Sequence, residues 1–280
     1  MSRTPPEWCE RMKILDQVCK PEEYEQVFPS RICFLPGGTD AASAEQILLH
    51  EHVLDVFLNE SHTLRVVCTP NMLSELVLGR LLTEGYIHSA ENVEALYVCD
   101  QGRRAQVLLK KMAELPDLKG KQAVVQEVST CCTDTCVLSE AQRRYRTMAP
   151  LPAVEWEGNW IWRLLDRFEK DTRLHQLTHA THSAMLSRGD ELLFEAEDIG
   201  RHNAVDKVIG AAVKQGVDLH ACILFTTGRM PVDMVRKAVM ARIPVMVSKE
   251  APTCEGAELA KTYGLHLIGN VKNGKMIVYS

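Results

Sequence analysis

Short β-branched and apolar runs dominate the first half of the chain. The runs 52–68 and 93–109 each predict a β-hairpin with a polar turn at its centre. Between them, Thr69 opens a segment with apolar residues at helical spacing, and we expect its side chain to cap that helix. Residues 1–47 show no sustained period. The pattern therefore predicts an N-terminal arm over 1–47, whose degree of order it leaves open, and a smaller α+β domain over 48–148.

In the second half of the chain, strands and helices alternate at short intervals. Apolar stripes predict helices over 203–215, 231–241 and 253–263, and the short apolar runs between them predict strands. Strands that alternate with helices form a largely parallel sheet covered by helices, so we expect an α/β domain over 154–280. The residues Ala-Pro-Leu-Pro-Ala at 149–153 break the pattern and indicate a linker.

Composition and charge remove several classes of function. The 32 Lys and Arg residues are outnumbered by 37 Asp and Glu residues, and the net charge of −5 argues against binding to nucleic acid through overall charge. No run reaches the ~18 apolar residues of a membrane-spanning helix, and the first residues lack the apolar core of a signal peptide. We therefore expect a cytoplasmic protein without a membrane partner. In that reducing compartment, its ten cysteines indicate metal, redox or catalytic chemistry rather than disulfides.

Three of these cysteines, Cys131, Cys132 and Cys136, are bunched in a loop (131–136) that ends the predicted α+β domain. Their neighbours are small and polar, a composition that exposes sulfur rather than packing it. An accessible thiolate is reactive, and a second thiol within reach can resolve a persulfide or a disulfide. The spacing C-C-x3-C is neither the redox C-x-x-C nor a paired zinc knuckle, so a metal site and incidental cysteines stay open as alternatives.

Three histidines, His175, His179 and His182, follow at spacings of four and three, which would place them on one face of a helix. Together with the three cysteines they would complete a metal site. The polar residues between them, Thr178 and Thr181, favour a loop instead, in which the histidines contact a phosphate or water.

Two polar segments lie where an anion would bind. Arg201 and His202 precede an apolar helical stripe, and the free N–H groups at a helix start add to their side-chain donors. Thr227, Gly228 and Arg229 follow a predicted strand, at the edge where α/β sheets bind ligands, although an ordinary strand-to-helix turn shows the same pattern. The phosphate-loop, dinucleotide-fold and zinc-deaminase signatures are absent from the sequence.

The most specific motif of the chain is Glu197-Asp198-Ile199-Gly200-Arg201-His202-Asn203-Ala204-Val205-Asp206-Lys207. The motifs that accompany it are Thr69-Pro70, Leu82-Thr83-Glu84-Gly85, Gly228-Arg229 and the runs 248–253 and 267–279. Together they resemble the FdhD/NarQ family of formate dehydrogenase accessory sulfurtransferases. The resemblance covers the chain from about residue 50 to its end.

The resemblance implies a cytidine-deaminase-like fold, a three-layer α/β sandwich with a mainly parallel sheet, beside the smaller N-terminal α+β domain. It implies a cytoplasmic sulfurtransferase that forms a homodimer. Such a protein accepts persulfide sulfur from a cysteine desulfurase and transfers it to the molybdenum cofactor, bis-molybdopterin guanine dinucleotide. Formate dehydrogenase or a related molybdoenzyme then receives that cofactor, which the carrier holds as cargo, and no stably bound metal is expected.

This hypothesis assigns the sulfur chemistry to the three bunched cysteines. Cys131 or Cys132 carries the persulfide, and Cys136 is the second thiol that assists its release. The family's cofactor-binding stretch maps onto 270–275. The cofactor-binding residues that we expect are Asn270, Val271, Lys272, Asn273, Gly274, Lys275, Arg201, His202, Thr227, Gly228, Arg229 and His182.

Two departures from the family pattern leave alternatives open. The family loop usually reads C-G-x-C, whereas the loop at 131–136 reads C-C-T-D-T-C, so the persulfide carrier is undecided. The family's T-G-G-x-H becomes T-H-A-T-H at 178–182, which indicates a divergent paralogue with an altered cargo or target. The other two hypotheses are a metal-binding or redox-sensing module, which uses the cysteines with nearby histidines, and a cofactor-binding chaperone that moves no sulfur.

Overall fold

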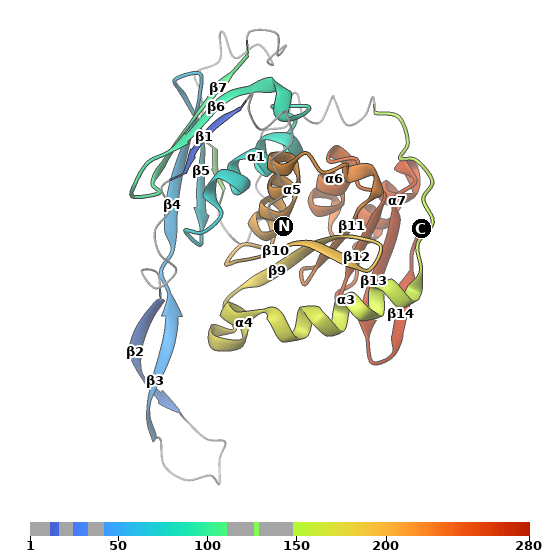
Figure 1. Cartoon of the computed structure of the whole chain (residues 1–280). Helices are drawn as coiled ribbons and strands as arrows, with labels where there is room; N and C mark the ends of the chain where they lie inside the picture. The colour runs from blue at the N-terminus through green and yellow to red at the C-terminus, as the bar shows by residue number, and fades with distance from the viewer. Residues whose placement is uncertain (1–11, 17–24, 33–41, 111–125, 129–147) are drawn as a thin grey trace, which may run out of the picture.

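The structure, a computed structural model, describes residues 12–16, 25–32, 42–110, 126–128 and 148–280. It consists of two lobes packed side by side and a two-stranded arm that stands away from both (Figure 1). Among the described residues, no helix is both long enough and apolar enough to cross a bilayer. The domain boundaries expected from the sequence stay predictions.

The N-terminal lobe is a six-stranded sheet with a helix on one face. Its strands, in spatial order, are β1 (Lys13–Asp16), β6 (Val93–Val98), β7 (Arg104–Leu109), β4 (His52–Leu58), β5 (Ser61–Cys68) and β8 (Gln126–Val128). Both predicted hairpins are confirmed, because β4 pairs antiparallel with β5 and β6 with β7. Strand β1 comes from the segment predicted as an arm and pairs with β6.

The helix of this lobe, α1 (Leu73–Thr83), begins later than the sequence pattern indicates. Its N-cap residue is Met72, in the left-handed conformation and without a side-chain cap. The prediction that Thr69 caps the helix is therefore wrong. The hydroxyl and N–H groups of Thr69 instead contact Asp198, from the other half of the chain.

The C-terminal lobe is also built on a six-stranded sheet. Its strands, in spatial order, are β10 (Glu191–Asp198), β9 (His182–Arg188), β11 (Ile223–Thr226), β12 (Val245–Ser248), β13 (His266–Lys272) and β14 (Lys275–Val278). The central strands β11, β12 and β13 are parallel, as predicted. The sheet as a whole is mixed rather than mainly parallel, because β9–β10 and β13–β14 are tight hairpins that add antiparallel strands.

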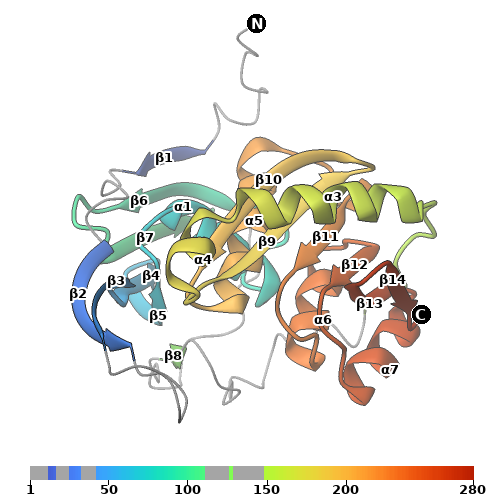
Figure 2. The same cartoon turned by 90° about the horizontal axis from the view of Figure 1, so that it is seen from below.

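Helices cover both faces of this second sheet, which makes three layers (Figure 2). One face carries α5 (Arg201–Gln215), α6 (Val232–Met240) and α7 (Cys254–Tyr263), close to the predicted positions. The other face carries α3 (Gly158–Asp171), which α4 (Arg173–Thr178) follows. Two 3-10 turns, η2 (Ala90–Asn92) and η3 (Leu219–Ala221), complete the described elements. The β11 side chains alternate between the two cores, with Leu224 toward α5 and Phe225 toward α3.

The two lobes meet where α1 and α5 cross in close contact. A Cβ atom built on Gly79 of α1 would lie 1.8 Å from the backbone oxygen of Asp206 in α5. A Cβ atom on Gly210 of α5 would lie 1.8 Å from the backbone oxygen of Glu75 in α1. Since real carbon and oxygen atoms cannot approach so closely, both glycines are required for the helices to touch.

The arm is the antiparallel ribbon of β2 (Glu25–Ile32) and β3 (Ala42–Leu49). It projects away from the two lobes, beneath β4 in the view of Figure 1. At the base of the arm, Glu25 of β2 forms a two-point ion pair with the guanidinium of Arg173, at the start of α4, with distances of 2.6 and 3.1 Å.

Candidate functional site

The most specific motif of the sequence lies largely inside the protein. The ammonium group of Lys207 is fully buried, 2.6 Å from the Asp198 carboxylate, and donates to the Thr69 hydroxyl at 2.8 Å and to Asn71 at 2.6 Å. Asp198 also accepts hydrogen bonds from the N–H of Gly200 and from the N–H of Thr69. These contacts tie the start of α5 to the loop before α1.

A second buried group of charges is centred on Asp206, the residue of α5 directly before Lys207. The Asp206 carboxylate accepts hydrogen bonds from Lys237 of α6, at 2.9 and 3.0 Å, and from the Thr83 hydroxyl at 2.8 Å. The Arg80 Nε atom is 2.8 Å from the same carboxylate. Glu84 lies within ion-pair distance of Arg80 and Lys237, and these positive charges hold the pKa of its carboxyl below the ordinary value against the effect of burial.

These contacts explain why the motifs at 69–70, 82–85 and 197–207 occur together in one sequence. Buried charges are tolerated where they are paired and hydrogen-bonded, and each motif supplies partners for another. Asp198, Asp206 and Lys207 are therefore parts of the scaffold. Within the motif at 197–207, Arg201 and His202 are the partly exposed basic residues at the start of α5.

Arg201 lies at the carboxyl end of the sheet, where the sequence predicts an anion site. Its side chain lies across Gly228, where a Cβ atom would stand 2.9 Å from its Cδ atom. The buried Nε atom of Arg201 has no hydrogen-bond partner among the described residues. Arg229 follows Gly228, is exposed, and forms no ion pair within the described part of the chain. Two guanidinium groups are thus available at this edge for a phosphate or a carboxylate.

His182, the first residue of β9, completes this group. Its Nδ1 atom is 3.4 Å from the Thr227 hydroxyl. Burial lowers the pKa of His182, and the positive charges of Arg201 and Arg229 lower it further. The histidine is therefore a neutral group in a positive field. We refer to His182, Arg201, Thr227 and Arg229 as the basin.

Other predicted anion ligands already have internal partners. The Thr227 hydroxyl accepts from the Ser183 N–H at 3.0 Å. The Gly228 N–H donates to the Thr226 hydroxyl, and its carbonyl accepts from the Ser248 hydroxyl at 2.7 Å. These bonds fix the ends of β9, β11 and β12 and hold the arginines in place. The α5 and α6 helices also begin here without side-chain caps, which leaves N–H groups that favour an anion.

An anion in the basin is expected to raise the pKa of His182, because a negative charge stabilises the protonated imidazole. In the free protein this histidine titrates below its ordinary pKa of 6.5. Proton NMR titration with and without inorganic pyrophosphate measures the shift, and a His182→Gln variant assigns the resonance. An imidazole pKa that pyrophosphate leaves unchanged would contradict an anion site beside His182.

His202, the second helical residue of α5, has a different environment from that of Arg201. Its Nε2 atom is 2.9 Å from an Asp233 carboxylate oxygen in the first turn of α6, without the alignment of a linear hydrogen bond. Burial holds the pKa of His202 well below its ordinary value, and nearby cations, Lys237 and Arg80 first, act in the same direction. His202 is therefore neutral at pH 7. No sequence pattern singles out Asp233, since an acidic residue in a first helical turn is common.

The depressed pKa of His202 makes the fold sensitive to acid. Below the ordinary histidine pKa of 6.5, the unfolded chain binds a proton that the folded chain excludes, so stability falls as the pH drops. We expect urea denaturation to show a smaller loss of stability between pH 7 and pH ~5.5 in a His202→Gln variant than in the wild type. An identical loss in both proteins would contradict this assignment.

The predicted stretch 270–275 forms the hairpin between β13 and β14. Asn270 lies near the basin edge, where its N–H donates to the Glu250 carbonyl and its amide to the Tyr279 hydroxyl at 2.8 Å. The Val271 side chain is fully buried in the core against α3 and cannot contact a ligand. The residues of the turn, with the lysines that flank it, are exposed: Lys272, Asn273, Gly274 and Lys275. Whether they bind a cofactor stays a prediction.

The predicted sulfur-carrying residues Cys131, Cys132 and Cys136 lie outside the described residues. Among the described ones, no group of three or more His, Cys, Asp or Glu side chains is placed to hold a metal ion. The ring of His175 contacts the Thr181 carbonyl at 2.8 Å, and His179 is an exposed residue that ends α4. The described histidines thus give no support to a metal site. The hypothesis of a metal-binding module therefore rests on the cysteines.

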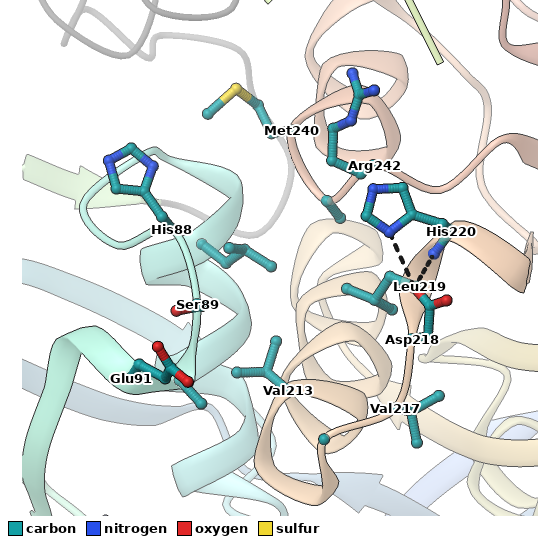
Figure 3. Close-up of a pocket in the computed structure, with 14 residues that line it drawn as sticks. His88, Ser89, Glu91, Val213, Val217, Asp218, Leu219, His220, Met240 and Arg242 are labelled. Atoms are coloured by element: carbon teal, nitrogen blue, oxygen red, sulfur yellow. Dashed lines mark hydrogen bonds and ion pairs between the residues drawn. The ribbon is translucent and has the colours of Figure 1, made fainter. Parts of the chain in front are cut away.

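A cavity of about 530 Å³ lies elsewhere, at the carboxyl ends of α5 and α6 (Figure 3). Its base is apolar, and its walls carry His88 and Glu91 on one side and Asp218, His220 and Arg242 on the other. The Arg242 guanidinium is used in hydrogen bonds to the carbonyls of residues 149 and 150. The basin is at the opposite ends of the same two helices, so the cavity is a separate feature.

The comparisons with known proteins agree with the motif pattern. Residues 49–280 match the FdhD/NarQ family. The chain is 28% identical to the sulfur carrier protein FdhD of Wolinella succinogenes, over 85% of this chain and 82% of that one. It is 26% identical to the protein of the same name from Shouchella clausii, over 83% and 87%.

A solved structure is also similar. It is the crystal structure of a protein from Desulfotalea psychrophila described as a formate dehydrogenase accessory protein, with a TM-score of 0.73 and 26% identity. The match covers 92% of this chain and 97% of that one. The family match spans far more than half of the sequence and includes every basin residue. The chain therefore belongs to the FdhD/NarQ family.

Proposed function

We propose that this protein is a sulfur carrier that accepts persulfide sulfur from a cysteine desulfurase and passes it to the molybdenum cofactor for formate dehydrogenase. The observation that carries the proposal is the basin, in which Arg201 and Arg229 stand at uncapped helix starts with no carboxylate partner in the described part of the chain. Relatives named as sulfur carriers and as a formate dehydrogenase accessory protein support the same assignment.

The chemistry of the basin fits the proposed cargo. Bis-molybdopterin guanine dinucleotide carries phosphate groups, and guanidinium pairs and helix starts bind phosphates well. The buried, unpartnered Nε atom of Arg201 supports a ligand at this position. In this proposal Arg201, Arg229 and His182 hold the anionic groups, and the hairpin at 270–275 closes over them. The helices on both faces of the C-terminal sheet support the cytidine-deaminase-like sandwich that the resemblance implies.

The sulfur step proposed for the cysteine loop balances without an outside oxidant. The thiolate of Cys131 or Cys132 attacks the outer sulfur of the desulfurase persulfide, and the desulfurase cysteine leaves as a thiolate. Attack by Cys136 on the inner sulfur then forms a disulfide and releases hydrosulfide to the acceptor. The two electrons that reduce the transferred sulfur come from this dithiol, which an external thiol must reduce again before the next cycle.

The partners follow from this cycle. They are a cysteine desulfurase as donor, formate dehydrogenase or a related molybdoenzyme as destination, and a second copy of the chain in a homodimer. The cycle takes place in the cytoplasm, where thiols stay reduced.

Sulfur loading tests the proposal directly. After incubation with a cysteine desulfurase and cysteine, intact mass spectrometry is expected to show one added sulfur atom on the wild type. The Cys254→Ala variant, which removes an exposed thiol of α7, is the matched control and keeps the added sulfur. Loss of the adduct in Cys131→Ala or in Cys132→Ala identifies the carrier.

The remaining outcomes discriminate the other hypotheses. A wild type that takes up no sulfur but still binds guanosine diphosphate would refute sulfur transfer and support a cofactor-binding chaperone. Stoichiometric zinc or iron in protein purified without chelator, lost in Cys136→Ala, would support the metal-binding module.

Binding of guanosine diphosphate tests the basin by itself. A charge-assisted hydrogen bond contributes about 1.5–3 kcal/mol, so Arg229→Ala is expected to weaken binding about 10- to 100-fold. Arg163→Ala is the control, because Arg163 is an exposed residue of α3 that pairs with Asp190 away from the basin. Equal affinities of the two variants in titration calorimetry would rule out a role for Arg229.

A further inference from the structure

The short helix α4 lies at the start of β9 and carries two histidines that the proposed function does not use (Figure 1). His175 is part of the helix, and His179 directly follows its last residue. His179 is three residues before His182 of the basin, so the Cα atoms of these two residues lie within about 11 Å of each other. A charge on His175 would lower the pKa of His182, so these two rings are electrostatic neighbours. The histidines of α4 therefore border the basin.

The position of α4 is fixed by Glu197, the first residue of the motif at 197–207. The Glu197 carboxylate, on β10, accepts hydrogen bonds from the N–H groups of Leu174 and His175, at 2.8 and 2.7 Å. The same carboxylate accepts from the hydroxyl of Thr181, the residue before β9, at 3.2 Å. One side chain thus holds both the first turn of α4 and the segment that leads into the basin. A group held in place in this way loses little entropy when a ligand binds to it.

The ring of His175 is fixed as well. Its Nδ1 atom lies 2.8 Å from the Thr181 carbonyl, and because a carbonyl oxygen only accepts, this nitrogen carries the proton. The ring of His179 packs at right angles against the ring of His175, with 5.6 Å between the ring centroids and 87° between the planes. A perpendicular contact is a favoured arrangement of aromatic rings. His175 therefore orients the ring of His179, which is an exposed residue.

His179 has a backbone conformation that favours glycine. Its φ angle is 53°, in the left-handed region. Glycine is the usual residue in this conformation at a helix end, because a Cβ atom raises its energy. The family pattern T-G-G-x-H also has glycine where this chain has His179. Backbone strain of this kind is concentrated at functional sites. The imidazole of His179 is thus a candidate for contact with a ligand, in a form specific to this chain.

The ligand group that suits this position is an aromatic base. In the proposed function the arginines of the basin hold the phosphate groups of the cargo. Each of these phosphates is joined through a ribose to a guanine base, which must lie beside the basin rather than in it. Imidazole rings stack on nucleobases, and the contact depends on a flat ring rather than on charge. An exposed ring that a neighbouring ring holds in one orientation provides such a surface.

We propose that the ring of His179, oriented by His175, stacks on a guanine base of the cargo whose phosphates lie in the basin. The inference rests on the proposed function, which supplies a guanine dinucleotide as cargo. It adds the residue that contacts the base, and it makes His179 a determinant of ligand affinity that the family pattern lacks. It uses none of the sulfur chemistry.

Titration calorimetry with guanosine diphosphate and with inorganic pyrophosphate tests the stack. His179→Gly is expected to weaken binding of guanosine diphosphate at least ~5-fold, the effect of losing one stacked base, and to leave the affinity for pyrophosphate unchanged. His179→Phe keeps a flat ring without a hydrogen-bond donor or a charge, so it is expected to bind guanosine diphosphate more tightly than His179→Gly does. Urea denaturation verifies the fold, and His179→Gly is expected to be at least as stable as the wild type, because glycine suits a positive φ.

Glu60→Gly is the matched control. Glu60 is an exposed residue with a φ angle of 73° in the turn between β4 and β5, so glycine relieves the same type of backbone conformation in the N-terminal lobe, outside the basin. This variant is expected to bind both ligands as the wild type does.

The outcomes separate this inference from the proposed function. A His179→Gly variant that binds guanosine diphosphate as tightly as the wild type would overturn the stack. Equal losses for guanosine diphosphate and pyrophosphate would overturn it too, because the histidine would then contact phosphate, and so would a His179→Phe variant no tighter than His179→Gly. A wild type that binds pyrophosphate as tightly as guanosine diphosphate refutes the stack alone, whereas a wild type that binds neither refutes the basin as well.

Discussion

Gly210→Ala is expected to destabilise the protein by about 3 kcal/mol or more, the upper end of the cost of overpacking a core. The added methyl group would stand 1.8 Å from the Glu75 carbonyl oxygen, a backbone atom that cannot rotate away. To make room, α1 and α5 must separate, and the buried charges between Arg80 and Asp206 must separate with them. Urea denaturation followed by circular dichroism measures the loss.

Gly158→Ala is the matched control for this substitution. Gly158 is the first residue of α3, and a Cβ atom there would meet the Met276 side chain at an ordinary 3.6 Å. Alanine in a helix is more stable than glycine by about 0.5–1 kcal/mol, so this variant is expected to be neutral or slightly stabilised. If the two variants had equal stabilities, the close crossing of α1 and α5 would be refuted.

Lys207→Met is expected to cost about 3–5 kcal/mol, the range for removing one partner of a buried ion pair. The Asp198 carboxylate would keep its hydrogen bonds but lose the ammonium group 2.6 Å away, and it is fully buried. The Thr69 hydroxyl and Asn71 would lose the same donor. Methionine fills much of the lysine volume, so the measured loss in denaturation reports the charge rather than a cavity.

Two further variants isolate the charge. Lys214→Met removes a partly exposed lysine paired with Glu75, for which about 0–1 kcal/mol is expected. The double variant Asp198→Asn with Lys207→Met removes both charges and is expected to be more stable than Lys207→Met alone, because no unpaired buried charge is left. If Lys207→Met alone were within ~1 kcal/mol of the wild type, the buried pair of Lys207 and Asp198 would contribute little to stability.

Local patterns predicted most of the elements correctly. The hairpins β4–β5 and β6–β7 and the helices α5, α6 and α7 follow from the spacing of apolar residues within each segment, which sequence records directly. The edge strands were harder. The spacing predicts a hairpin at 184–195 and an edge strand at 275–279, but the prediction of a mainly parallel sheet did not place these antiparallel pairs at its edges. The choice of neighbour in a sheet is a tertiary property that no single run contains.

The site was predicted less completely, for a physical reason. Charged residues at 197–207 look alike in sequence whether they bind a ligand or one another. Asp198 and Lys207 meet Thr69, more than a hundred residues away, and no local signal separates them from Arg201. The same limit hid the contact between His202 and Asp233. Arg229 was accessible to prediction because a strand end followed by glycine and arginine is a local pattern.

The buried charges between the lobes have a consequence for how such proteins can change over time. Asp206 and Lys237 belong to one lobe and Arg80 and Glu84 to the other, and ion pairs between Arg80 and Asp206 and between Lys237 and Glu84 link the two sets across the junction. A recombination event that joined the first half of one relative to the second half of another would succeed only where both parents carry the same interlocking set. Neither half is an exchangeable module, and substitutions at this junction must arise in compensating pairs.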